Sequence, residues 1–135
     1  MEDTATENVG GVQPDDELKA WIKQQMDAAV PRLIELGLAD AVVFEAKPAW
    51  VFPYTLLIGQ CRDRGRQRGF DWFICGDAPL SHVGHDKAAT PREAARHFAL
   101  KWQLDAARQG EAGAELARKA EALYELVGED SLWKE

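Results

Sequence analysis

The stretch FDWFICGDAPLSHVGHDKAATPREAARHFALKWQL, residues 70–104, decides the fold. It opens with an apolar segment, residues 70–75, passes through a Gly-Asp-Ala-Pro turn and ends in a helical pattern. Thr90, Pro91 and Glu93 form a helix start: a capping hydroxyl, a proline at the first helical position and a carboxylate that can reach back to the cap. The stretch therefore predicts a strand followed by a helix that begins at Pro91.

The helix that begins at Pro91 carries an apolar stripe. Ala94, Phe98 and Trp102 recur every four residues, which places them on one face of a helix. Gly110 is the expected stop, because glycine readily adopts the backbone conformation that ends a helix. We expect this stripe to be buried on a sheet as scaffold and not to line a reactive cleft.

Upstream of this stretch lie two further segments of strand character. Residues 41–46 and 53–61, taken together with residues 70–75, are enriched in valine, isoleucine, phenylalanine and tryptophan, and each segment is shorter than a typical helix. With residues 70–75 they are joined by short loops without an intervening helix, which predicts an antiparallel meander. Residues 49–52 lie between two prolines and are expected to form a connection or an edge segment.

Helical patterns flank the strands on both sides in the sequence. A first helix should begin near Pro14, and Pro31 should kink or break it, leaving a further turn that ends at Gly37. A last amphipathic helix should end at Gly128, and the tail that contains Trp133 can dock back. The predicted fold is α+β, in the order α-β-β-β-α-α: a three-stranded antiparallel meander, with room for a fourth strand, and helices packed on one face.

Length and composition limit the class of protein. The 135 residues correspond to one ordinary domain, so we expect residues 14–135 to form it and residues 1–13 to be a disordered acidic tail. Residues 49–58, the longest apolar run, are far shorter than the roughly 20 residues of a membrane span. With no export signal at the N-terminus, a cytoplasmic protein without membrane contact is expected. The net charge of -7 argues against nucleic acid as the partner.

Two motifs together resemble a known family. They are WFICGDAP, residues 72–79, and PREAARHF, residues 91–98, followed by Trp102. This combination is similar to the bacterial domain of unknown function 4826, and the similarity extends from the first predicted helix onward. The resemblance implies a small bacterial protein without an established activity. We expect no cofactor.

Four arginines alternate between the second and third predicted strands, in the segment CRDRGRQRG, residues 61–69. Only Asp63 opposes their charge. One interpretation is a docking point for an acidic protein surface or a nucleic-acid backbone, because guanidinium groups bind carboxylate and phosphate. The other is a solvated turn whose charges protect a sheet edge from pairing. No aromatic residues alternate with the arginines to stack on bases.

The turn and the helix beyond it carry candidate catalytic residues. Asp77 follows a strand end, where it could act as a general base or simply close the turn. His82, His85 and His97 lie nearby in sequence, and these side-chain types suit a zinc or iron site, although no standard ligand spacing is present. His97 also lies four residues after Glu93 and can pair with it. The alternative hypothesis is therefore a small hydrolase, with or without a metal.

The five tryptophans fall into two groups. Trp21, Trp72 and Trp102 fit apolar faces and are predicted to be core residues. Trp50 and Trp133 are predicted to be exposed, and exposed tryptophan is a frequent anchor of protein interfaces.

The two cysteines, Cys61 and Cys75, are expected on neighbouring strands. Without an export signal they are best interpreted as buried thiols, and a cross-strand disulfide is the alternative.

These observations favour a non-enzymatic protein-interaction module over an enzyme. A more specific version is an immunity-type protein that blocks a toxin. The partner is expected to be a protein or a second copy of the chain. The residues expected to bind it are Arg62, Arg64, Arg66, Arg68, Asp77, His82 and Trp50.

Overall fold

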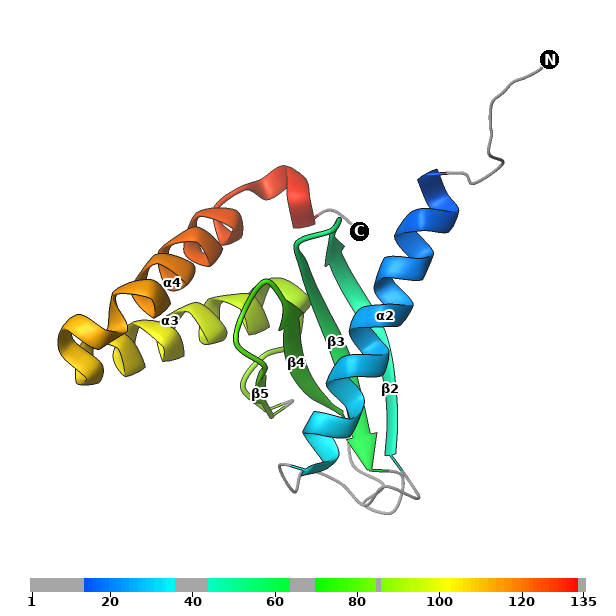
Figure 1. The fold of residues 1–135 in the computed structure, drawn as a ribbon, viewed down its shortest axis with the longest axis horizontal. Coiled ribbons are helices and arrows are strands. Elements are labelled where there is room, and N and C mark those ends of the chain that lie inside the picture. Colours follow the sequence, from blue (N-terminus) through cyan, green and yellow to red (C-terminus); the bar gives the residue numbers. More distant parts are fainter. Residues whose placement is uncertain (1–13, 36–43, 64–69, 85, 134–135) are drawn as a thin grey trace.

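The computed structural model describes residues 14–35, 44–63, 70–84 and 86–133 (Figure 1). The predicted tail, residues 1–13, lies outside them. The elements follow in the order α2 (Pro14–Glu35), β2 (Phe44–Phe52), β3 (Leu56–Asp63), β4 (Asp71–Gly76), β5 (Ser81–Val83), α3 (Pro91–Gln109), the 3-10 turn η1 (Gly110–Gly113), α4 (Ala114–Val127) and the 3-10 turn η2 (Asp130–Trp133).

The strands form one four-stranded antiparallel sheet in chain order, β2-β3-β4-β5. The predicted α+β class and the antiparallel meander are confirmed. β5 is the fourth strand for which the sequence left room. It has three residues and is placed by its pairing with β4, in which Ser81 lies opposite Ile74.

The sequence predicts helices on one face of the sheet, but in the structure helices cover both faces (Figure 1). On β4, Trp72 and Ile74 pack into the core beneath α3 and α4, whereas Phe73 and Cys75 pack into the core beneath α2. All four side chains are buried. A strand that is apolar without alternation is typical of burial on two faces, which explains the sequence of β4.

Helix α2 continues through Pro31 and is not broken there. Ala29 and Leu33, on either side of the proline, are both buried against the sheet. Their burial offsets the backbone hydrogen bond that a proline removes, so the helix persists. The predicted end at Gly37 lies outside the described residues.

Strand β2 is an edge strand that includes Pro48. The register with β3 shifts between Pro48 and Trp50, which marks a bulge. A proline is tolerated here because an edge strand does not need every N–H for pairing. The edge interpretation of residues 49–52 is thus confirmed. The next strand begins only at Leu56, after a turn in which Tyr54 has a φ of 62°.

Helix α3 begins and ends where the sequence predicts. The Thr90 hydroxyl accepts a hydrogen bond from the Glu93 N–H at 3.1 Å, and the Glu93 carboxylate accepts one from the Ala89 N–H at 2.7 Å. Gly110, with a φ of 63°, ends the helix. The apolar stripe is buried: Ala94, Phe98 and Trp102 are at most 2 % exposed.

Helix α4 ends at Val127, before Gly128, as predicted. The turn η2 then docks on the core, because the Trp133 indole N–H donates to the Leu126 carbonyl oxygen at 2.8 Å. The predicted docking of the tail is confirmed. No helix within the described residues has the length and apolar character needed to cross a membrane.

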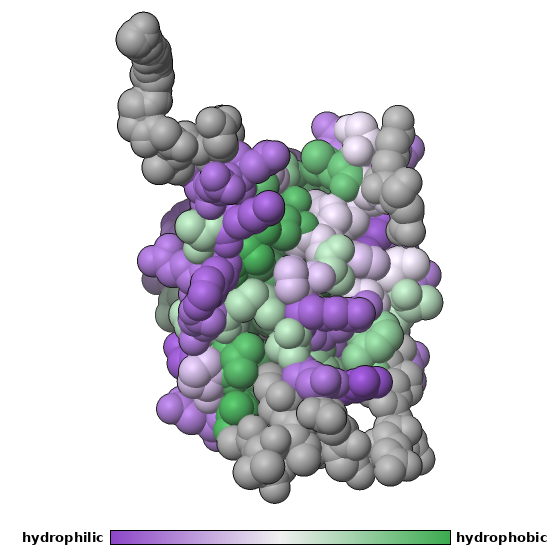
Figure 2. All heavy atoms as spheres, turned by 90° about the vertical axis from the view of Figure 1, so that its right-hand side faces the viewer, coloured by the Kyte–Doolittle hydropathy of each residue, from purple (hydrophilic) through white to green (hydrophobic). Residues whose placement is uncertain are grey.

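Figure 2 shows the side of the molecule on which α2 and the β2 edge are exposed. A band of apolar side chains lies between helix and sheet, and hydrophilic side chains cover the outer side of α2. Trp21, predicted as a core residue, is only half-buried: it packs against the core beneath α2 and contacts Tyr54, with the ring centroids 5.9 Å apart.

Candidate functional site

A groove lies over β2 and β3 on the side of the sheet that faces α3. It consists of two pockets, of about 580 and 680 Å³, which share Lys47 and Gln60. These two residues are opposite each other in the β2–β3 pairing, and Glu45 is opposite Arg62 in the next inward-facing position. We call this surface the β2–β3 groove. Its principal lining residues are Glu45, Lys47, Trp50, Gln60, Arg62, Phe70, Arg92 and Trp133.

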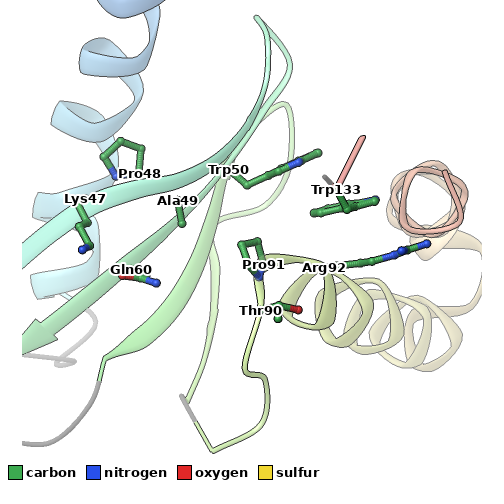
Figure 3. A pocket seen from close by; sticks show the side chains of 9 residues that line it. All are labelled: Lys47, Pro48, Ala49, Trp50, Gln60, Thr90, Pro91, Arg92 and Trp133. Carbon is green, nitrogen blue, oxygen red and sulfur yellow. The ribbon is translucent and has the colours of Figure 1, made fainter. Parts of the chain in front are cut away.

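Two stacked indoles lie at one end of the groove (Figure 3). The rings of Trp50 and Trp133 have centroids 4.1 Å apart and planes only 11° apart. The Trp50 indole N–H donates to the Leu132 carbonyl at 2.8 Å, so both indole N–H groups are used within the chain. The expectation that these two tryptophans are exposed is wrong, because each ring is half-buried against the other. They form a wall of the groove.

Arg92 holds the same end of the groove together. Its Nε donates to the Val127 carbonyl at 2.8 Å, and one Nη lies 2.6 Å from the Asp130 carboxylate. These bonds join the first turn of α3 to the end of α4. Asp130 is 88 % exposed, so the ion pair itself adds at most about 1 kcal/mol. Its main effect is to fix the position of the guanidinium group.

The middle and the far end of the groove carry two more cations. Arg62 pairs with Glu45 across the strands, at 2.9 Å between Nε and Oε1. Lys47 is exposed and has no ion pair with any residue that the structure describes. Three cations, Lys47, Arg62 and Arg92, thus line the groove with one carboxylate, Glu45. The groove is therefore locally cationic in a chain with a net charge of -7. Arg64, Arg66 and Arg68, also predicted to bind a partner, lie outside the described residues.

Asp77 lies elsewhere, at the end of β4 that adjoins α4. Its backbone N–H donates to the Thr55 carbonyl at 2.8 Å and closes the β3–β4 pair after Gly76, whose φ is 107°. Its carboxylate is 76 % exposed and binds the Lys119 ammonium at 2.9 Å. The side chain of Asp77 therefore makes a contact that neither sequence interpretation included.

The histidines do not join Asp77 in the described structure. His82 lies on β5 opposite Phe73, and burial is the main cause that lowers its pKa, with Lys101 adding to the effect and Asp71 opposing it. The pocket that Asp77 lines contains no histidine. Within the described ranges, no three His, Cys, Asp or Glu side chains are grouped to hold a metal ion. His85 lies outside those ranges.

The two cysteines are free and buried, as expected. In the β3–β4 register Cys61 lies opposite Asp71, whereas Cys75 lies opposite Leu57, so the thiols are four positions apart along the strands. Burial raises the pKa of Cys61 to about 12 and that of Cys75 to about 11. Both are neutral thiols within the core.

Residues 15–133 match the sequence model of a domain of unknown function, DUF4826. The chain belongs to this family. Searches of curated proteins and of solved structures gave no match. The DUF4826 match includes nearly all of the described elements, from α2 to η2, and with them the β2–β3 groove.

Sequence reasoning missed several groove residues of this DUF4826 domain. The sequence predicts Arg62 and Trp50 as binding residues, but it does not predict Lys47, Gln60 or Arg92 as such. One signal was available: along LLIGQCRD, residues 56–63, Gln60 and Arg62 continue the face of Ile58 with polar side chains. A face that changes from apolar to polar within one strand indicates that the covering helix ends there.

Proposed function

We propose that this DUF4826 protein is a non-catalytic interaction module that binds an acidic segment of a partner protein in the β2–β3 groove. The observation that carries the proposal is the pair of adjoining pockets lined by Lys47, Arg62 and Arg92. Ion pairs within the chain engage the two arginines but not the lysine, in the part of the chain that the structure describes. A carboxylate of a partner protein would form an ion pair with Lys47 and complement the positive charge of the groove.

The dimensions of the groove fit a short extended segment. From Arg62 to Ile58, which pairs with Trp50, β3 covers four residue steps, or about 13 Å of strand. Roughly four residues of an extended peptide cover the same length. An acidic side chain would meet Lys47 in the middle, and an apolar one would lie against the ring of Trp133 or Phe70.

The arginines at the β3–β4 connection extend the proposal beyond the described residues. Residues 64–69 join Asp63 to Phe70, and Phe70 lines the groove. The contribution of Arg64, Arg66 and Arg68 to partner binding rests on the sequence alone. The most specific version of the proposal, an immunity-type protein whose partner is a toxin, rests on the small size and acidic charge of the chain. A second copy of the chain is the alternative partner.

Charge reversal in the groove tests the proposal. Tagged wild-type protein and the variant Lys47→Glu/Arg62→Glu are used to capture partners from lysate of the native host, with quantification by mass spectrometry. The control is Lys19→Glu/Arg32→Glu, which makes the same change of charge at exposed positions of α2, on the other face of the sheet. Thermal unfolding confirms that each variant is folded.

The wild type and the α2 control should retain the same partner, whereas the groove variant should lose it by about tenfold or more. Each reversed charge that faces a partner carboxylate costs about 1 kcal/mol or more. Equal recovery from all three proteins would contradict a role of the groove. Failure of the wild type to retain any protein at native abundance would contradict the interaction itself.

A further inference from the structure

Another pocket, separate from the groove, lies between α4 and the turn that joins β2 to β3. Its volume is about 540 Å³, and it shares no lining residue with the β2–β3 groove. The walls are mainly apolar: Phe52, Leu56, Trp102, Leu123 and Leu126 line them. All five side chains belong to or pack on the core between the sheet and α4, so the pocket has a firm floor.

The rim of this pocket is acidic. Glu125 and Glu129 line it, both are exposed, and neither has an ion pair with another described residue. Asp77 and Lys119 line it too, but they bind each other at 2.9 Å. Three carboxylates thus face one ammonium group, which leaves a surplus of two negative charges.

The end of α4 positions the two glutamates. The helix ends at Val127, between them. Because the Arg92 guanidinium already binds the Val127 carbonyl at 2.8 Å, the negative charge at this mouth comes from the carboxylates and not from the helix end. Glu125 lies in its last turn and Glu129 follows it. The pocket therefore combines an apolar interior with a mouth that attracts cations.

We propose that this pocket binds an arginine or lysine side chain of a basic partner protein. The aliphatic stem of such a side chain would lie on Phe52 and Leu126, while its charged end would lie between Glu125 and Glu129. Long basic side chains suit this arrangement because they bury methylene groups and keep the charge at the surface. The proposal concerns a different surface from the β2–β3 groove and is independent of the function proposed above.

Two peptides that differ only in charge test the inference. Acetyl-Gly-Arg-Gly-amide is titrated into the ¹⁵N-labelled full-length protein, and its citrulline counterpart, which has the same shape without the charge, serves as the control. The arginine peptide should shift the backbone amides of Leu126, Gly128 and Glu129 in a saturable manner at millimolar concentration. The citrulline peptide should bind about fivefold more weakly or worse.

Variants locate the effect. Glu125→Gln/Glu129→Gln should weaken the arginine peptide about fivefold or more, whereas Glu111→Gln/Glu121→Gln, with the same change of net charge, should alter its affinity less than about twofold. Lys119→Gln should strengthen binding about two- to fivefold, because it releases the Asp77 carboxylate. The spectra show directly whether each variant is folded.

Three results would overturn the inference: equal binding of the citrulline peptide, equal weakening by both pairs of glutamine substitutions, or no saturable shift up to about 10 mM peptide. The groove variant Lys47→Glu/Arg62→Glu should bind the arginine peptide as the wild type does. This comparison distinguishes a failure of the proposal for the β2–β3 groove from a failure of the proposal for the acidic pocket.

Discussion

The indole N–H groups of the two most buried tryptophans show how single residues decide the packing. Trp72 donates to the Ala88 carbonyl at 2.8 Å, and Trp102 donates to the Ser81 hydroxyl oxygen at 3.0 Å. The Ser81 hydroxyl in turn donates to the Pro79 carbonyl at 3.2 Å. Composition and spacing predict that both tryptophans are buried, but they do not predict which atoms accept hydrogen bonds from the indole N–H groups. Those partners come from segments that only the fold brings close.

Ser81 is therefore expected to matter more for stability than its size suggests. Ser81→Ala leaves the buried indole N–H of Trp102 without its acceptor, which costs about 1–3 kcal/mol of unfolding free energy. Urea denaturation monitored by tryptophan fluorescence measures the loss. Ser131→Ala, at an exposed position, is the control and should change stability by less than about 0.5 kcal/mol. Equal stability of the two variants would disprove this role of the hydroxyl.

At the level of elements, the sequence predicts a helix or strand well where the residues that fix its ends lie close to those ends. Helix α3 was predicted at both ends because its cap, its proline and its terminal glycine act within one turn of the residues concerned. β5 could not be predicted as firmly, because three residues acquire strand character only by pairing with β4. The continuation of α2 through Pro31 depends on burial against a sheet that follows later in the chain.

The turn η2 is the element whose role the structure defines most sharply. Trp133→Ala removes the stack on Trp50 and the hydrogen bond to Leu126, so we expect a loss of about 2 kcal/mol in unfolding free energy. Trp133→Phe keeps an aromatic ring and should lose only about 1 kcal/mol. Chemical denaturation gives both values. Tyr124→Ala, which truncates an exposed ring on α4, is the control, and a loss as large as that of Trp133→Ala would refute the docking role.

At the level of the whole molecule, charge is distributed unevenly around the sheet. The β2–β3 groove is cationic and the pocket beside α4 is acidic; Trp133 of η2 lines the groove, and Glu129, directly before η2, lines the pocket. Net charge from the sequence gives only the sum of these surfaces and cannot reveal that they have opposite signs.

The candidate site was predictable only in part for a related reason. Arg62 and Trp50 stood out by composition, and both line the groove. Lys47, Gln60 and Arg92 are ordinary surface types, and they meet only because antiparallel pairing and the docking of α3 bring them together. Their spacing in the sequence does not show that these three residues lie close together in space.

Photo-crosslinking from inside the groove tests the central claim most directly. Gln60 is replaced by p-benzoylphenylalanine, and Gln24, an exposed glutamine of α2, is replaced in the same way as the control. After irradiation in the native host, the adducts are digested and sequenced by mass spectrometry. We predict a partner peptide rich in aspartate and glutamate that is linked to position 60 and absent at position 24. The same adducts from both positions, or none from position 60, would contradict the account.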